Sequence, residues 1–310
     1  MSFGFLNVDK PAGMTSHDVV NRIRRIVGTR QVGHAGTLDP MATGVLIICV
    51  GAATRLSEYV MSEVKVYRAI VHLGVETDTY DADGTVLAEL DPSDITLEHI
   101  LATLPRFQGE IHQRPPAYSA IKQGGHKLYE LARKGKIVEV PPRPVTIHAI
   151  DILNWASPRL TVEVTCSAGT YIRSLAHDLG EALGVGAHLA GLARTTSGEF
   201  QLADAIVLDT LIAGQNATAH LIPPTRALRK HPRVTLDLEA ELNLRHGRAA
   251  ALSAEFPDGQ TIMAFDSDDQ LVAVCNVREG SLRPAKVFAD ITPADDTSGL
   301  GDGDSEMDSE

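Results

Sequence analysis

The chain has few cysteines, and their placement argues against stabilisation by disulfides or by a bound zinc ion. Its three cysteines, Cys49, Cys166 and Cys275, lie far apart, and no Cys/His spacing is typical of a zinc site. Cys49 and Cys166 stand inside apolar runs, which indicates small buried side chains in a reducing compartment. We therefore expect neither a disulfide framework nor a structural metal.

Long apolar segments are also missing. No apolar run reaches the roughly 20 residues that a membrane span needs. The first residues, MSFGF, have neither the basic start nor the apolar core of a signal peptide. The 44% hydrophobic and 22% charged residues are typical of a globular protein, and 310 residues are enough for two domains. We expect a cytoplasmic protein that does not enter a membrane.

Positive charge is scarce overall, because the formal net charge is -12. Such a total argues against nucleic-acid binding, which needs Lys and Arg to neutralise phosphates. The distribution argues the other way. The tail over residues 293–310 carries acids and no base, whereas bases dominate between residues 106 and 143. These bases are Arg106, Arg114, Lys122, Lys127, Arg133, Lys134, Lys136 and Arg143. The local field is therefore the relevant quantity, although a solvated helix could also carry such a run.

Periodicity predicts a mixture of strands and helices. Strands are expected over residues 3–8, 44–50, 66–74, 145–155 and 160–167, and helices over residues 54–61 and 97–104. Ser16 is the expected N-cap of a helix that ends near Gly28, and Gly169-Thr170 is expected to open another. Tyr67, Ala69, Val71 and Leu73 share one strand face.

A break near Pro223-Pro224 precedes a different pattern. The segments 260–265 and 271–277 flank a polar turn, which indicates a hairpin within a small β domain. The tail after Thr292 is rich in Gly, Ser and Asp, lacks periodicity and is expected to be disordered.

The most informative segment is residues 33–44, which read GHAGTLDPMATG. Asp39 stands among glycines that permit unusual backbone conformations, and Pro40 disfavours a helical conformation at Asp39. A glycine-rich turn with local Asp hydrogen bonds would give a similar short pattern. A carboxylate fixed in a non-regular loop, with His34 five residues before it, is nevertheless typical of a reactive group.

Together, four segments carry a specific resemblance over most of the first 200 or so residues. Residues 33–44 match the pattern G-H-x-G-x-L-D-P-x-A-T-G of the TruB family of tRNA pseudouridine synthases. The other segments are residues 9–16 with Lys10, residues 66–68, and residues 166–173 followed by Leu192. The chain thus resembles a family of bacterial enzymes that isomerise uridine 55 in the T loop of tRNA. In the family, the segment with Lys10 braces the catalytic loop.

The resemblance implies roles for individual residues. Asp39 would be the catalytic carboxylate, Arg173 its ion-pair partner that keeps it ionised, and Tyr67 the residue beside the flipped base with a hydroxyl for the C5 proton. Tyr171 and Leu192 would line the pocket, and His34 would fill or flank the space that the flipped nucleotide leaves. RNA contacts are expected from Lys10, Lys122, Lys127, Arg133 and Arg194. Ala193 stands where the family commonly has a second arginine.

For the fold, the resemblance implies an α/β (α+β) pseudouridine synthase fold with a central mixed or antiparallel sheet. We expect a catalytic domain over residues 1–228 with an inserted basic thumb at about residues 112–144. A small C-terminal β-barrel (PUA-like) domain would span residues 229–292, and a disordered acidic tail residues 293–310. The reaction needs no cofactor or metal. The expected partner is the T arm of tRNA, bound by a monomer that needs no protein partner and that could assist tRNA folding.

Three other functions remain open on the sequence. The chain could be a non-catalytic RNA-binding or tRNA-folding factor on the same scaffold. It could be an aspartate-dependent nucleoside hydrolase, although a free nucleoside needs no basic thumb. It could also be a family member guided by a separate RNA, which the absence of a basic tail disfavours.

Overall fold

The computed structural model describes residues 3–116, 118, 122–123, 126–127, 140–212, 217–252 and 254–288. These residues form two compact units, divided between Leu228 and Arg229. The predicted tail over residues 293–310 and most of the predicted thumb lie outside the described residues. Within the described part of the chain, no helix is both long enough and apolar enough to cross a membrane.

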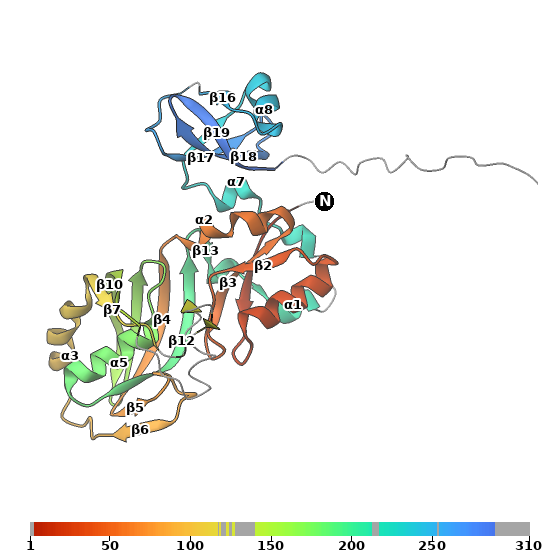
Figure 1. Ribbon diagram of the computed structural model, residues 1–310. Coiled ribbons are helices and arrows are strands. Elements are labelled where there is room, and N and C mark those ends of the chain that lie inside the picture. The colour runs from red at the N-terminus through yellow and green to blue at the C-terminus, as the bar shows by residue number, and fades with distance from the viewer. Residues whose placement is uncertain are drawn as a thin grey trace, which may run out of the picture. The chain divides into compact units, whose positions relative to one another are not determined.

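A ten-stranded mixed sheet organises the first unit (Figure 1). Its main path runs β14-β1-β3-β12-β4-β11-β10-β7, with β2 paired to β3 and β13 paired to β12. The strands are β1 (Gly4–Lys10), β2 (Val32–Ala35), β3 (Thr43–Val50), β4 (Lys65–Leu73), β7 (Gly109–Gln113), β10 (Arg143–Ala156), β11 (Arg159–Cys166), β12 (Ala187–Ser197), β13 (Phe200–Gln201) and β14 (Ile206–Val207). The β1–β14 and β3–β12 pairs are parallel, and the others are antiparallel. The predicted mixed sheet is confirmed.

Short elements complete this unit. Two small two-stranded sheets pair β5 (Val75–Thr77) with β6 (Val86–Glu89), and β8 (Lys122–Gln123) with β9 (His126–Lys127). The helices are α1 (Ser16–Val27), α2 (Ser57–Met61), α3 (Leu97–Thr103), α5 (Ile172–Leu183), α6 (Leu208–Ile212) and α7 (Pro224–Ala227). Single 3₁₀ turns occur at η1 (Gly51–Leu56), η2 (Leu104–Phe107), η3 (Leu202–Asp204) and η4 (Ala217–His220).

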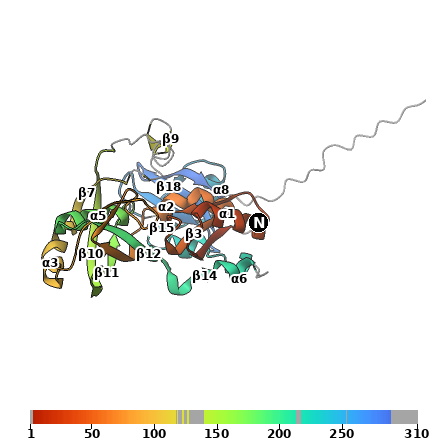
Figure 2. The same ribbon diagram turned by 90° about the horizontal axis from the view of Figure 1, so that it is seen from below.

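One half of the core forms where α5 packs against the sheet (Figure 2). The alternation predicted along residues 66–74 is confirmed in β4, where Ala69, Val71 and Leu73 are buried and Arg68 and Ile70 are exposed. Apolar residues of α5, among them Leu175 and Leu179, cover the face that Ala69, Val71 and Leu73 line. This packing fixes the start of α5 over strand β4 and, with it, the side chains that leave the first turn.

The other half of the core lies under α1. The helix predicted to end near Gly28 is confirmed, and its apolar residues Val19, Val20 and Ile23 are buried against β1 and β3. The predicted N-cap was wrong by one residue. Thr15 caps the helix and forms a capping box with Asp18, whereas Ser16 is buried and bonds to another segment.

The second unit is a small β domain. Its five-stranded sheet runs β15-β17-β18-β19-β16, over β15 (Arg233–Thr235), β16 (Ala250–Ala251), β17 (Thr261–Phe265), β18 (Leu271–Arg278) and β19 (Ser281–Val287). Helix α8 (Leu238–Arg245) packs Ala240 and Leu244 against this sheet. The predicted hairpin is confirmed as the antiparallel β17–β18 pair. The sheet fits the predicted PUA-like domain.

Candidate active site

Asp39 lies in the segment that joins β2 to β3. The predicted non-regular loop is shorter than residues 33–44, because residues 33–35 belong to β2 and residues 43–44 to β3. Gly44 has φ +93°, and a Cβ at this position would collide with the backbone of Arg194 on the neighbouring strand β12. The glycine therefore allows β3 and β12 to approach each other where the Asp39 segment ends.

Two side chains from the N-terminal segment brace this loop. Ser16 Oγ donates to the carbonyl of Leu38 (3.1 Å) and accepts from its amide (2.9 Å), so it satisfies both backbone groups of the residue before Asp39. Lys10 Nζ donates to the carbonyls of Pro11 (2.9 Å), Met14 (2.6 Å) and Pro40 (3.2 Å). The loop is thus held on both sides of the carboxylate.

Lys10 corrects one expectation from the sequence. It was predicted to contact RNA, but its side chain is fully buried and its ammonium group is used by backbone carbonyls. Burial lowers its pKa to about 8, against the opposing effect of Asp39. The bracing role that the resemblance implied agrees with this geometry.

Arg173 brings two carboxylates together. Its Nε lies 3.0 Å from Asp39 Oδ2 in an ion pair outside hydrogen-bond geometry, and its Nη2 donates to Asp39 Oδ1 over 3.2 Å. Its Nη1 lies 3.2 Å from Asp81 Oδ2 and also donates to the Thr79 carbonyl. The structure therefore pairs Arg173 with Asp39, as the sequence predicted, and adds Asp81, which the sequence did not indicate.

Burial and the neighbouring charges shift the pKa of Asp39 in opposite directions. Partial burial raises its pKa above the ordinary value, and Asp81 raises it further, whereas Arg173 and Lys10 lower it. The Asp39 side chain keeps 35% of its surface exposed, while Arg173 keeps 6%. The accessible member of the pair is thus the carboxylate, and the buried member is the cation that stabilises its charge.

A cavity of about 290 Å³ opens beside Asp39. This volume equals about ten water molecules at ~30 Å³ each, which is room for one pyrimidine nucleoside. Tyr67, Tyr171, Leu192 and Arg173 all line the cavity, so the structure gathers these predicted residues around Asp39. Among the described lining residues, Asp39 is the only carboxylate.

Tyr67 approaches the cavity from strand β4. Burial raises the pKa of its hydroxyl, and a hydrogen bond and the positive charge of Arg194 oppose that rise. Arg194 itself is buried, and it donates to the carbonyls of Val45 (2.7 Å) and Gly36 (3.1 Å). Its guanidinium also lines the cavity beside Tyr67, and its contact with RNA stays a prediction.

His34 lies on β2, opposite Ile48 of β3, and is not among the residues that line the cavity. Burial lowers the pKa of its imidazole, with Arg194 as a further cause, so the neutral form is favoured. Its Nδ1 is buried and has no hydrogen-bond partner. The structure thus places His34 on a strand outside the cavity lining, and its role beside a flipped nucleotide stays a prediction.

The predicted thumb contacts are described only in part. Lys122 and Lys127 pair through the backbone in the β8–β9 hairpin, and nothing of their side chains is described. Arg133 lies outside the described residues. Their contacts with RNA remain predictions.

Sequence reasoning missed two charged residues at the site. Asp81 sits in a polar turn with several other acids, and nothing in that pattern distinguishes it. The second residue is Lys65, which lines the cavity and is buried. Its ammonium group donates to the carbonyls of Met61 (2.6 Å) and Glu63 (2.5 Å). Burial lowers its pKa to about 8. Only its position at the start of a strand beside Tyr67 could have indicated it.

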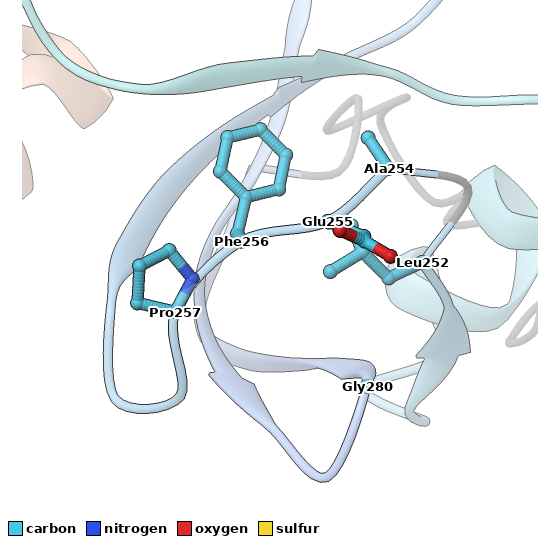
Figure 3. A pocket seen from close by; sticks show the side chains of 6 residues that line it. All are labelled: Leu252, Ala254, Glu255, Phe256, Pro257 and Gly280. Atoms are coloured by element: carbon cyan, nitrogen blue, oxygen red, sulfur yellow. The ribbon is translucent and has the colours of Figure 1, made fainter.

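Two further features are not part of this cavity. In the described chain, one set of three residues could offer grouped metal ligands, namely His177, Asp178 and Glu181 of α5, and none of them lines the cavity. A larger hollow of about 680 Å³ lies in the C-terminal unit beside Leu252, Phe256 and Pro257 (Figure 3). Its described lining holds a single ionisable side chain, Glu255, so it offers less chemistry than the smaller cavity at Asp39.

Comparison with solved structures identifies the fold. An H/ACA ribonucleoprotein bound to a substrate RNA containing 2′-deoxyuridine matches with a TM-score of 0.73 and 28% identity, over 93% of this chain and 85% of that chain. A Cbf5–Nop10–Gar1 complex matches with a TM-score of 0.71 and 29% identity, over 93% and 85% of the two chains.

Sequence comparison agrees. The model of the TruB family pseudouridylate synthase N-terminal domain matches residues 24–172, and that of the tRNA pseudouridylate synthase B C-terminal domain matches residues 173–231. A tRNA pseudouridine synthase B from Symbiobacterium thermophilum is 49% identical over 288 residues, covering 92% of this chain and 95% of the relative. One from Gloeobacter violaceus is 46% identical over 291 residues, covering 92% and 98%.

The matched family models and the curated relatives identify an isomerase of the pseudouridine synthase class. The chain belongs to the TruB family of pseudouridylate synthases. The fold class and the family that the sequence motifs indicated are thereby confirmed.

Proposed function

We propose that the protein converts uridine 55 in the T loop of tRNA to pseudouridine. The observation that carries the proposal is the cavity at Asp39, where the one carboxylate among the described lining residues is paired with Arg173. The tRNA substrate is supported by the relatives called tRNA pseudouridine synthase B, which align over nearly the whole chain.

The reaction requires little beyond a carboxylate and a shielded pocket. The N1–C1′ bond of uridine breaks, the base turns, C5 joins C1′, and the proton of C5 ends on N1. No atom enters or leaves, so no redox or group-carrying cofactor is needed. Asp39 acts on the nucleotide as a nucleophile at C1′ or C6, or as a base toward a sugar proton.

The cavity residues divide the remaining tasks. Tyr67 lies against the base, and its hydroxyl takes part in moving the C5 proton. Tyr171 and Leu192 form apolar walls that keep water from the cleaved base. Because the cavity holds one nucleoside, the uridine must leave its stack to reach Asp39.

Binding of the T arm is assigned to the basic stretch that includes Lys122, Lys127 and Arg133. An excess of Lys and Arg in a chain that also has a cavity for one nucleoside suits an RNA loop with one base turned out. We infer a monomer that acts without a protein partner and that could assist tRNA folding. A tRNA substrate places the reaction in the cytoplasm.

Mapping the modified position tests this function. Unmodified tRNA transcripts carrying uridine or cytidine at position 55 are incubated with the protein, and pseudouridine is mapped along each. We expect pseudouridine at position 55 of the first transcript and none in the second. Binding without modification would support a folding factor, and release of free uracil would support a hydrolase. Activity only with an added guide RNA would support a guided enzyme. Each of these results contradicts the proposal.

A further inference from the structure

Gln113 is a buried amide next to the active site that none of the chemistry above uses. It is the last residue of β7, and only 2% of its surface is exposed. Its side chain leaves the strand toward α5 and meets the backbone of Tyr171, which lines the Asp39 cavity. A fully buried glutamine needs partners for its carboxamide, and here both partners belong to one residue.

The two hydrogen bonds are reciprocal. Gln113 Nε2 donates to the Tyr171 carbonyl over 2.9 Å, and the Tyr171 amide donates to Gln113 Oε1 over 2.7 Å. Only one orientation of the carboxamide satisfies both bonds, so the contact itself fixes which atom is oxygen and which is nitrogen. The amide thus pairs with Tyr171 as a neighbouring strand would.

This pairing fixes the backbone conformation of Tyr171. The amide of Tyr171 belongs to the peptide plane before its Cα, and the carbonyl belongs to the plane after it. Holding both planes fixes φ and ψ, which are -100° and 106°. These two angles set the direction in which the tyrosine side chain leaves the chain.

Tyr171 is also the residue from which α5 begins. It stands at the N-cap, where no side chain of its own supplies a capping bond, and its carbonyl accepts the first helical bond from Leu175 over 3.1 Å. Gln113 fills the second acceptor position of the same carbonyl. Arg173, which pairs with Asp39, leaves the helix two residues later.

Neighbouring contacts hold the same two segments together. Ser174 Oγ donates to the Arg114 carbonyl over 2.8 Å, and Arg173 Nη2 donates to the Tyr118 carbonyl over 2.9 Å. Gln113, Arg114 and Tyr118 are therefore each bonded to the start of α5. Of these contacts, only the two hydrogen bonds of Gln113 hold the backbone of a residue that lines the cavity. In the described part of the chain, Gln113 itself contacts no carboxylate and does not line the cavity.

We propose that Gln113 is a positioning residue for the isomerisation. Its carboxamide fixes Tyr171 at the start of α5, so that the tyrosine lines the cavity and Arg173 meets Asp39. This inference rests on the proposed function, because its effect is a change in the rate of pseudouridine formation.

A Gln113→Met variant tests the proposal. Methionine keeps the length and burial of the side chain but can form neither bond. We expect the single-turnover rate constant on tRNA to fall by about tenfold to hundredfold, because small displacements of reacting groups cost rates of that size, while the Kd for tRNA changes by less than about threefold. Gln108→Met is the matched control, since Gln108 is exposed just before the same strand, and its rate constant should equal that of the wild type.

A Gln113→Glu variant adds a readout that a merely structural role would not change. A neutral carboxyl reproduces both bonds, whereas a carboxylate repels the Tyr171 carbonyl. Burial favours the neutral acid. We expect the ratio of variant to wild-type rate constants to rise as pH falls between about pH 9 and pH 5. Taking the ratio cancels the titration of Asp39 in both proteins.

Two results would overturn the inference. One is a Gln113→Met protein that folds and turns over at the wild-type rate. The other is a ratio of Gln113→Glu to wild-type rate constants that stays constant over the pH range. This second result also overturns the inference if Gln113→Met fails to fold. A wild-type protein that forms no pseudouridine in tRNA would instead contradict the proposed function, so the two failures are distinguishable.

Discussion

Asp39 and Asp81 share the guanidinium of Arg173, and this arrangement explains how a partly buried carboxylate can be reactive. Arg173 offsets the burial of Asp39, while Asp81 competes for the same positive charge. The pKa of Asp39 is therefore raised by burial but held down by its partner. Tyr67 faces a similar balance, because burial raises its pKa and Arg194 lowers it.

Tyr67→Phe should retain tRNA binding and lose turnover. Phenylalanine keeps the flat ring but lacks the hydroxyl that the proposed mechanism uses to move the C5 proton. Loss of one general acid–base group typically costs a factor of about 10² to 10⁴ in rate. Single-turnover kinetics with a parallel binding assay measures this, and a wild-type rate would reduce Tyr67 to a stacking residue.

The acid side of the pH–rate profile should report the Asp39 pKa. The carboxylate is the active form, so the rate falls as pH drops through a pKa that lies above the ordinary 3.8. Removing the negative charge in Asp81→Asn should lower that pKa and move the loss of activity to lower pH. Removing the positive charge in Arg173→Gln should move it to higher pH.

Single-turnover rates across the acid range measure both shifts. Displacement of the two profiles in the same direction would show that the three side chains do not act electrostatically as described. The wild-type profile serves as the reference for both variants.

At the scale of elements, the active site is assembled by segments that contact each other only in the folded chain. The loop between β2 and β3 carries Asp39, and the N-terminal segment braces it through Ser16 and Lys10. Helix α5 supplies Arg173, and β4 supplies Tyr67. The loop keeps its shape because buried polar side chains satisfy its backbone groups.

Ser16→Ala should destabilise the protein and slow catalysis. The substitution leaves the amide and carbonyl of Leu38 buried without their partner, which costs about 1–3 kcal/mol. For a domain of this size, each kcal/mol lowers Tm by about 2–4 °C. Thermal unfolding measures the loss, and Ser62→Ala is the control, because the hydroxyl of the exposed Ser62 donates to the carbonyl of Tyr59 on its own turn. Equal Tm and rate in wild type and Ser16→Ala would contradict the bracing role.

Sequence reasoning located most of these elements but not their mutual contacts. Alternation predicted β4 and β11, and the apolar stripes predicted α1 and α5, because burial of one face imposes a period on the sequence. The motif located Asp39, Tyr67 and Arg173. The partnership of Asp81 with Arg173 could not be predicted, because it joins residues separated by 92 positions and Asp81 belongs to none of the matched segments. The burial of Lys10 and Arg194 was also missed, because charged residues are mostly exposed in proteins.

At the scale of the whole molecule, charge is segregated along the sequence. The total of -12 reflects an acidic tail, whereas bases dominate between residues 106 and 143. An RNA partner responds to the local field rather than the sum. The basic stretch is therefore the part of the sequence that we expect to contact the phosphates of tRNA.

Neutralising Lys122, Lys127, Arg133 and Lys134 together should flatten the salt dependence of tRNA binding. Each lost phosphate contact reduces the slope of log K against log salt by about 0.7–0.9. Binding titrations at several salt concentrations measure the slope. If it stays unchanged, the phosphate contacts lie elsewhere on the protein.

The most direct test of the account compares the wild type with Asp39→Asn on unmodified tRNA. Asparagine keeps the shape of the side chain but can act neither as nucleophile nor as base. The account predicts pseudouridine at position 55 with the wild type, equal tRNA binding by both proteins, and a variant rate below about a thousandth of the wild-type rate. An Asp39→Asn protein that formed pseudouridine faster than this would contradict the assignment of Asp39 as the catalytic carboxylate.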